Sequence, residues 1–170
     1  MNIFKSMVIA AACAMLMTAC SSEQNVPVNQ LFSEPGIYQS PNGKYLVEIS
    51  QLPDNKIKYF MRDDDGNGQG PGAFSNKYEL YLCWDDQSRV WSFHPQELVH
   101  YHFIDEERTR TVRLAPSSKS NSQIAGWSDM PTEFAKIIPE NISDLYEKSV
   151  IDGTRHIPIA EKLLDELLGK

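Results

Sequence analysis

Apolar and polar residues alternate along much of the chain beyond about residue 36. In "KYLVEIS" Val47 and Ile49 fall on one face of an extended chain, and in "KIKYFMR" Tyr59 and Met61 do the same. A period of two is typical of strands that bury one face. The intervening "QLPDN" supplies Pro, Asp and Asn, which favour tight turns. The two runs therefore predict a β-hairpin.

Further extended runs follow, each rich in aromatic or β-branched residues and bounded by polar turns. They are "KYELYLCW" (residues 77–84), "RVWSFH" (89–94), "ELVHYHFI" (97–104) and "TRTVRLA" (109–115). In the first run we expect the alternate residues Tyr78, Leu80, Leu82 and Trp84 to share the buried face. Together the runs predict an antiparallel meander of about six strands over residues 36–115.

The hydrophobic period changes after Pro116, and apolar residues then recur at helical spacing. The clearest segment ends the chain, where a stripe of apolar residues lies opposite charged ones. The stripe consists of Ile159, Leu163, Leu164, Leu167 and Leu168. We expect it to close one side of the sheet, with a partner-binding face as the alternative. The fold class predicted is α+β: a curved antiparallel β-meander followed by helices within residues 131–170.

The N-terminus has the layout of a secretory signal: one positive charge, an apolar run over residues 7–17, and small residues before Cys20. That run is too short to span a bilayer as a helix, which needs about 20 residues. The sequence "MTAC" resembles the lipobox of bacterial lipoproteins, with Met17 where Leu is commonest. Cys13 is a competing acceptor that would leave only about six apolar residues before it. An ordinary signal peptide cleaved before Cys20 is the other alternative.

The lipoprotein resemblance implies that Cys20 carries a diacylglyceryl group and, after cleavage, an additional acyl chain such as palmitate. Two or three such chains anchor a protein stably to a membrane. The organisation expected is a signal peptide (residues 1–19), a lipidated tether (20–30) and one globular domain (31–170). In Gram-negative lipoproteins Ser21, rather than Asp, implies the outer membrane, and we expect the domain to face the periplasm.

The chain is acidic, with 23 Asp and Glu against 16 Lys and Arg and a net charge of −7. Removing residues 1–19 takes away Lys5, so the charge becomes −8. This balance excludes nucleic acid as an expected partner, because binding to phosphates relies on Lys and Arg. It fits a basic protein partner or simple solubility. Cys83 is the only cysteine after Cys20, and we expect it to be buried in a strand rather than reactive.

The stretch "RDDDGNGQGPG" resembles part of a calcium loop. Asp63, Asp65, Asn67 and Gly68 occupy positions 1, 3, 5 and 6 of D-x-[DN]-x-[DN]-G, in which alternate oxygens wrap the ion. Position 12 holds Phe74 where a bidentate Glu is expected, and the flanks predict strands rather than helices. Asp63, Asp65 and Asn67 are therefore candidate ligands for calcium of weak affinity, and the alternative is a Gly-rich turn between strands. No other cofactor is expected.

Two histidines, His100 and His102, share one face of a predicted strand, a spacing that suits a metal, and His94 lies nearby. No Glu or Cys cluster completes the set, so we expect ordinary residues of a half-exposed sheet face. Two aromatic residues, Tyr81 and Trp91, lie opposite the expected core of their strands. They would line a binding groove if that face of the sheet were uncovered.

No sequence pattern of a nucleophile elbow, a zinc protease helix or a phosphate-binding loop occurs in the chain. The acidic pairs Asp85 with Asp86 and Glu106 with Glu107 fall in predicted turns, where charge is normally solvated. We therefore expect a non-catalytic protein-binding module of the bacterial envelope, of the inhibitor or immunity type. The alternatives are an assembly lipoprotein of a secretion or envelope complex, and a hydrolase whose site follows no known motif.

Overall fold

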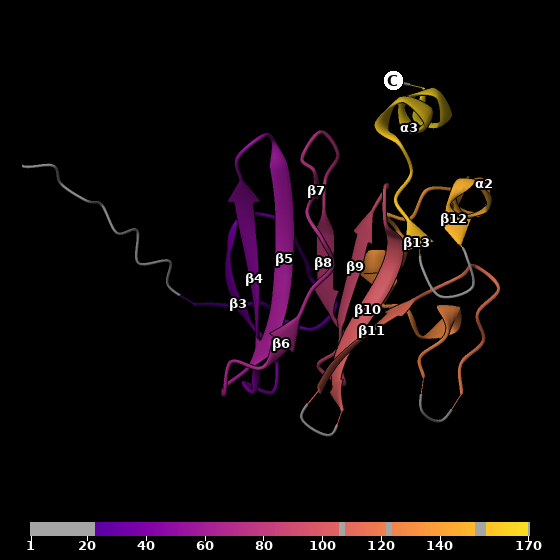
Figure 1. The fold of residues 1–170 in the computed structure, drawn as a ribbon. Coiled ribbons are helices and arrows are strands. Elements are labelled where there is room, and N and C mark those ends of the chain that lie inside the picture. Colours follow the sequence, from indigo (N-terminus) through magenta and orange to yellow (C-terminus); the bar gives the residue numbers. More distant parts are fainter. Residues whose placement is uncertain (1–22, 106–107, 122–123, 152–155, 170) are drawn as a thin grey trace, which may run out of the picture.

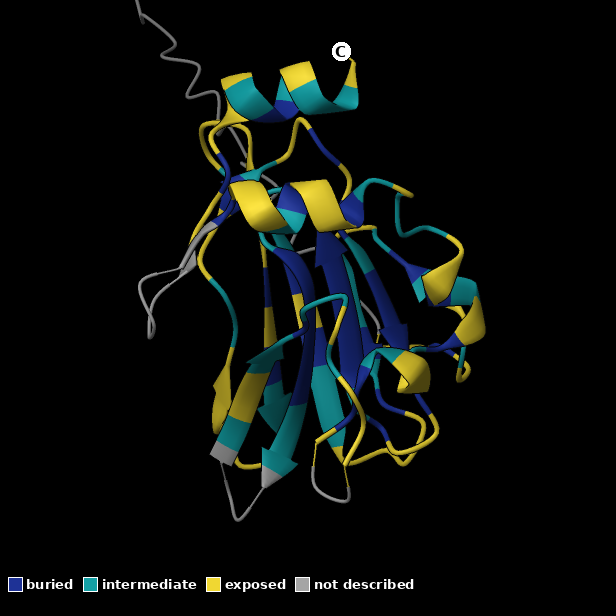
Figure 2. Ribbon diagram, turned by 90° about the vertical axis from the view of Figure 1, so that its right-hand side faces the viewer, coloured by how far each residue is buried: buried dark blue, intermediate teal, exposed yellow. Residues whose placement is uncertain are grey.

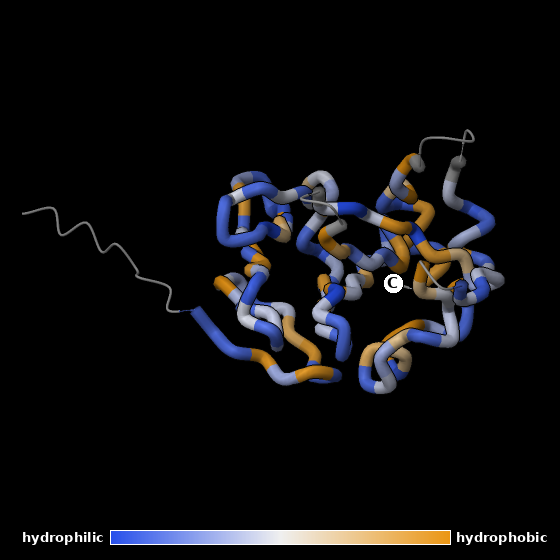
Figure 3. Tube along the Cα trace, turned by 90° about the horizontal axis from the view of Figure 1, so that it is seen from below, coloured by the Kyte–Doolittle hydropathy of each residue, from blue (hydrophilic) through white to orange (hydrophobic). Residues whose placement is uncertain are grey.

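The computed structural model describes residues 23–105, 108–121, 124–151 and 156–169. Two β-sheets and a layer of short helices lie one behind another (Figure 1). Figure 3 looks along the strands of the same arrangement. The α+β class is confirmed, but the strands divide into two stacked sheets where the sequence predicted a single curved one.

The first sheet has the order β1-β3-β4-β5-β6, with β7 also paired to β5. Its pairs are antiparallel except for β1 with β3. Its long hairpin turns through Asp54 and Asn55, both at positive φ, as Asp and Asn tolerate. The strands are β1 (Gln24–Asn25), β3 (Gly36–Gln39), β4 (Tyr45–Leu52), β5 (Lys56–Asp63), β6 (Gly68–Gln69) and β7 (Phe74–Ser75).

The second sheet has the order β11-β10-β9-β8-β2 and is antiparallel throughout. It lies between the first sheet and the helices. Its strands are β2 (Leu31–Phe32), β8 (Tyr81–Trp84), β9 (Val90–His94), β10 (Leu98–Asp105) and β11 (Arg108–Arg113). All five residues of β9 are buried, because this strand has a packed layer on each face.

The helical layer follows the second sheet in the chain. It contains η1 (Trp127–Asp129), α1 (Thr132–Ala135), α2 (Ile142–Lys148) and α3 (Glu161–Leu168), with a small β12 (Val150–Ile151) and β13 (His156–Ile157) ribbon between the last two. The ribbon interrupts the helical segment that the sequence predicted. None of the helices in the described part of the chain has the length and apolar composition needed to cross a bilayer.

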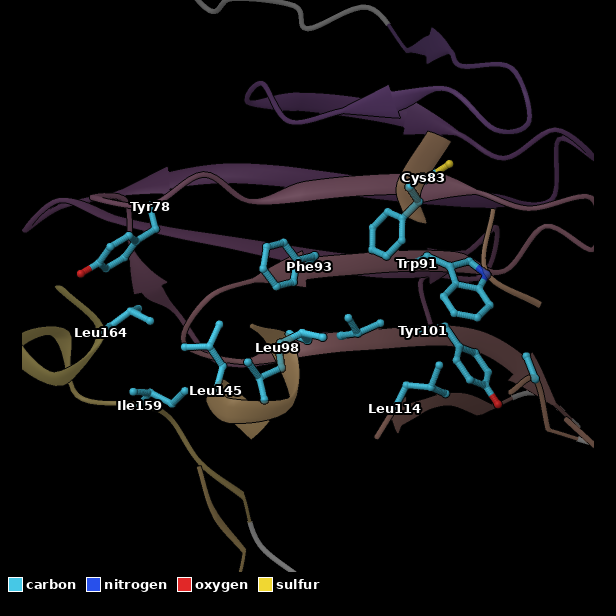
Figure 4. Close-up of a cluster of buried hydrophobic side chains, with 14 residues drawn as sticks. Tyr78, Cys83, Trp91, Phe93, Leu98, Tyr101, Leu114, Leu145, Ile159 and Leu164 are labelled. Carbon is cyan, nitrogen blue, oxygen red and sulfur yellow. The ribbon is translucent and has the colours of Figure 1, made fainter. Parts of the chain in front are cut away.

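Two hydrophobic cores result from this layering. One lies between the sheets and includes Val47, Tyr59 and Trp84. The other lies between the second sheet and the helices (Figure 4) and includes Trp91 and Leu164. Figure 2 shows the buried strands of the second sheet behind the helices.

The apolar stripe of the final helix closes the second core as predicted. Ile159 and Leu164 are 2% and 0% exposed and belong to that core, and Leu163, Leu167 and Leu168 pack against it. Burying such side chains contributes about 1.5–3 kcal/mol each. The stripe therefore forms part of the second core.

The predicted orientation of Tyr78 is wrong. Strand β8 begins only at Tyr81, and Tyr78 points away from Leu80, Leu82 and Trp84 into the second core. Tyr78 takes this orientation because its hydroxyl donates a hydrogen bond to Asp165 Oδ1 of α3 at 2.7 Å. A hydroxyl between the sheets would lack that partner, and an unpaired buried polar group is costly.

The start of the folded domain also differs from the expected boundary at residue 31. Gln24 and Asn25 pair with Tyr38 and Gln39 of β3, and Val26 is only 9% exposed. The chain is therefore already part of the first sheet four residues after Cys20. Residues 24–30 belong to the domain and not to the tether, because they supply an edge strand and a core side chain.

Candidate functional site

Within the part of the chain that the structure describes, one face of the first sheet has no covering layer. Its side chains form what we call the outer face. Strand alternation sends them away from Val47, Tyr59 and Met61, which point into the core. All the helices of the described residues lie on the opposite side of the molecule (Figure 1). The outer face consists of Ile37, Gln39, Leu46, Glu48, Ser50, Leu52, Lys56, Lys58, Phe60 and Arg62.

Three apolar residues gather on this face. Phe60 is 38% exposed and lies opposite Glu48, which on its other side lies opposite Ile37. Leu46 is the diagonal neighbour of both Ile37 and Phe60, a separation that long and aromatic side chains bridge. None of the three is part of either core. The apolar cluster therefore has no partner layer within the described part of this chain.

The charge of the outer face is opposite to that of the chain. Lys56, Lys58 and Arg62 follow one another on β5, against the single acidic residue Glu48. The face carries +2 on a chain whose net charge is −7. This local excess of positive charge around exposed apolar groups gives the face chemical selectivity, because it disfavours basic surfaces and attracts acidic ones.

The expectation that His100 and His102 occupy a half-exposed face is wrong. They are 6% and 0% exposed and point between the sheets, with their rings 6.4 Å apart. The Tyr59 hydroxyl from the opposite sheet hydrogen-bonds to Nε2 of His102 and, at 2.6 Å, to Ser92. Nδ1 of His102 is 2.8 Å from the Thr111 hydroxyl oxygen.

Burial sets the charge state of this network. It lowers the pKa of His102 to about 3 and raises the pKa of Tyr59. A neutral imidazole offers one donor and one acceptor, so it satisfies Tyr59 and Thr111 together. The network joins the two sheets through the buried hydrogen bonds of Tyr59 with Ser92 and His102, while Thr111 is exposed at its edge. It can fix their register, and it presents no group to a substrate.

His94 lies away from this network, against β7. Its Nε2 is 3.0 Å from the Ser75 carbonyl oxygen, and its ring stacks on Phe74 at 4.7 Å between centroids. Burial lowers the pKa of His94 to about 4. Within the described ranges, no three His, Cys, Asp or Glu side chains are grouped to hold a metal ion. The structure therefore does not bring the three histidines together.

The expectation of a solvated charge at Asp85 is also wrong. Asp85 is 5% exposed, and its carboxylate accepts hydrogen bonds from the backbone of Gln87 and Arg89. It also accepts from Arg89 Nε at 2.5 Å and from Trp91 Nε1 at 2.8 Å. The carboxylate thus organises the β8–β9 turn and joins it to the core. Asp86 is exposed, and the other acidic pair, Glu106 and Glu107, lies outside the described residues.

The candidate calcium loop forms the turn between β5 and β6. The Asp63 carboxylate accepts the Asn67 backbone N–H at 2.8 Å and the Asn67 side-chain amide at 3.4 Å. Asp65 is exposed beyond them. Gly68 is required by a close approach of strands, because a Cβ there would lie 2.1 Å from the Met61 carbonyl oxygen. The loop brings Asp63 and Asn67 together in a turn, and calcium binding stays a prediction.

The aromatic side chains do not line an open groove. Trp91 is 0% exposed beneath the helices, and Tyr81 is half-buried with its hydroxyl on Glu79. The prediction that Cys83 is buried is confirmed, since it is 0% exposed. Burial, reinforced by Asp85, raises the pKa of its thiol to about 12, so it is not a nucleophile at neutral pH.

Sequence reasoning missed the outer face, although a signal was present. Phe60 stands in "KIKYFMR" on the polar side of the alternation, between Lys58 and Arg62. An aromatic residue at such a position is the mark of an exposed apolar group. The predicted lipidation residue, Cys20, lies outside the described residues. The chain matches no family model, no curated protein and no solved structure.

Proposed function

We propose that this protein is a lipid-anchored, non-catalytic binding module of the bacterial envelope that holds a protein partner on its outer face. The observation that carries the proposal is the uncovered cluster of Ile37, Leu46 and Phe60 within a basic setting on an acidic chain. Exposed apolar clusters rimmed by charge are characteristic of protein interfaces. The histidines, the buried cysteine and Asp85 serve the fold, which supports a non-catalytic role.

The charge of the outer face selects the chemistry of the partner. A surface with acidic side chains around an apolar contact complements Lys58, Arg62 and Phe60. This differs from the basic partner that the overall acidity suggested, because the contact responds to the local charge and not to the net charge. An inhibitor role requires one such partner in a one-to-one complex. An assembly role places the same surface within a larger complex.

The outer face is tested by capture of partners from detergent-solubilised envelope. We expect wild-type protein to retain one acidic protein stoichiometrically, and Phe60→Asp to weaken its binding by about 30-fold or more, the effect of losing an interface anchor. Lys58→Glu should also weaken binding, and more so at low salt. The matched control is Ile124→Asp, because Ile124 is 42% exposed but lies outside the outer face.

Each result bears on the proposal. Equal capture by wild type and Phe60→Asp would place the contact elsewhere and overturn it. Capture of nothing, together with binding of the wild-type domain to anionic vesicles, would show that the face recognises lipid and not protein. The size of the captured complex separates an inhibitor from an assembly component.

The membrane anchor is tested separately with Cys20→Ala. We expect this variant to move from the membrane fraction to the soluble fraction, because loss of two or three acyl chains removes most of the membrane affinity. Metabolic labelling with palmitate should mark the wild type and the matched control Cys13→Ala, but not Cys20→Ala. Labelling of the Cys20→Ala protein would contradict the proposed anchor.

A further inference from the structure

A cavity of about 650 Å³ opens at one end of the two sheets, away from the outer face cluster. It lies where the β4–β5 turn, strand β7, the β9–β10 turn and the start of α3 meet. Volumes of roughly 300–1,000 Å³ are typical of sites for small molecules. Of the outer face residues, Lys56 alone also lines this cavity.

The walls of the cavity are joined by one side chain. The Gln96 amide accepts the Ser75 N–H at 3.0 Å and donates to the Ile159 carbonyl oxygen at 3.4 Å. The Ile159 N–H in turn donates to the Gln96 carbonyl oxygen at 3.2 Å, and Asn76 N–H donates to Asn55 at 2.8 Å. Four segments distant in the chain are thereby fixed around the opening. A site with fixed walls loses little conformational entropy when it binds a ligand.

The backbone hydrogen-bond donors of residues 75–77, at the end of β7 and just after it, are used within the protein. The backbone N–H groups of Ser75 and Asn76 donate to Gln96 and Asn55, and that of Lys77 donates to the Ser75 hydroxyl at 3.3 Å. The Lys77 ammonium contacts both carboxylate oxygens of Asp165 at 2.6 Å. These backbone N–H groups and the Lys77 ammonium are therefore already paired, and Lys56 is the other cationic residue of the lining.

The cavity lining has more carboxylate groups, which accept hydrogen bonds, than ammonium groups, which donate them. Three carboxylates, those of Asp54, Glu97 and Glu161, line the cavity against the ammonium groups of Lys56 and the already paired Lys77. A carboxylate has room for about four hydrogen bonds, so it accepts a ligand donor even when it has another partner. Ala73 and Pro158 add apolar contact surface to the same lining.

We propose that this cavity binds a small organic cation, an ammonium or guanidinium group on a short carbon chain, with its charge on Glu97 and its chain against Ala73 and Pro158. The inference goes beyond the proposed function, because it assigns a second site to different residues. An anion of the same size is disfavoured by the three carboxylates, and a wholly apolar ligand would leave them desolvated.

The setting of Glu97 supports this assignment. The β9–β10 turn places Leu98 at a φ of 65°, a left-handed conformation usually taken by Gly and costly for Leu, with strain of about 1 kcal/mol. Burial raises the pKa of Glu97 to about 7, while the positive charge of Arg113 on β11 opposes the rise. The other charged groups of the lining are Asp54, Lys56, Lys77 and Glu161.

The test uses pentylamine as the cationic probe and hexanoate as its anionic counterpart, both followed by amide shifts in ¹H–¹⁵N spectra of the whole domain. We expect pentylamine to shift the amides of Ser75, Asn76 and Glu97 with millimolar affinity, and hexanoate to leave them in place. Glu97→Gln should weaken pentylamine binding by about tenfold, the loss of one charge-assisted hydrogen bond. Glu140→Gln, an exposed carboxylate outside the cavity, should not.

A second variant and a second measurement test the cavity even if Glu97→Gln does not fold. Glu161→Gln changes an exposed residue and should weaken binding several-fold if Glu97→Gln fails to fold. Calorimetry near pH 7 in two buffers should show proton release, because a bound cation favours the ionised Glu97. Shifts equal for both probes, or unaffected by both variants, would overturn the site. The outer face takes no part in this experiment, so its outcome is independent of the partner test.

Discussion

Acidification from neutral pH to about pH 4 should unfold the domain, and two buried histidines should account for most of the lost stability. His102 is enclosed between the sheets by Tyr59 and Thr111, and His94 lies between Phe74 and the β9–β10 turn. Neither can keep a positive charge where it is buried. Protonation of either ring therefore requires the surrounding structure to open.

The direction and size of the stability change follow from the pKa of each histidine in the folded and in the unfolded chain. In the unfolded chain a histidine takes up a proton near pH 6.5, whereas in the folded domain His102 does so near pH 3 and His94 near pH 4. Below pH 6.5 the unfolded chain binds more protons, so the free energy of unfolding falls by about 1.4 kcal/mol per pH unit for each histidine. By pH 4 the loss is on the order of 7 kcal/mol, comparable with a whole domain's stability of about 5–15 kcal/mol.

Glu97 acts in the opposite direction. Burial raises its pKa from 4.5 to about 7, so its protonation favours the folded state as the pH falls through that window. Because the carboxyl is partly exposed and screened by solvent, we expect this gain to be about 1–2 kcal/mol. It offsets only a fraction of the loss caused by the histidines.

Urea unfolding followed by the fluorescence of the buried tryptophans, at several pH values from neutral to about pH 4, measures the effect. The His94→Gln and His102→Gln double variant should lose this fall in stability, because an amide does not titrate in this range, and should keep only the gain of about 1–2 kcal/mol that Glu97 contributes. The readout is the slope of the free energy of unfolding against pH, so a loss of stability that is equal at every pH does not affect it. An unchanged slope in the double variant would show that other groups cause the acid unfolding.

The second large effect is expected at the β8–β9 turn. Asp85→Ala should lower the free energy of unfolding by about 3–5 kcal/mol, the range for removing one partner of a buried ion pair. The substitution leaves the Arg89 guanidinium without its carboxylate and the buried Trp91 Nε1 without its acceptor. The turn also loses two backbone hydrogen bonds to Asp85 Oδ1.

Thermal and urea unfolding measure this loss, and the neighbouring residue supplies the control. Asp86 lies in the same turn but is exposed, so Asp86→Ala should change stability by no more than about 0.5 kcal/mol. Asp85→Asn should fall between the two, because it keeps one acceptor oxygen and loses the charge. Equal effects of Asp85→Ala and Asp86→Ala would mean that the contacts of Asp85 contribute little.

Local patterns predicted the elements of this fold, because each depends on near neighbours in the chain. The hairpin of β4 and β5 follows from strict alternation, and α3 follows from the stripe around Leu164. The division into two sheets depends instead on contacts between distant residues. His102 lies on the polar side of its strand and is buried only because Tyr59, far earlier in the chain, supplies its partner.

The same distinction separates the predicted from the unpredicted parts of the candidate sites. The predicted loop of Asp63 and Asn67 consists of residues close in sequence, and the structure does bring them together. The outer face needs the pairing of three strands, and the cavity around Glu97 needs four segments that the sequence does not show to be adjacent. Of these features, only the outer face was indicated in the sequence, by Phe60 at a position where the alternation predicts a polar residue.

The position of β1 limits how far the domain can travel from the membrane. With Cys20 acylated, as we propose, the chain enters the first sheet at Gln24 and can extend over no more than about 14 Å. The outer face belongs to that same sheet, so it stays within a thin zone above the lipid headgroups. A partner of the proposed interface would therefore have to reside in, or be delivered to, that zone, and would meet the anchored domain by movement in the membrane plane.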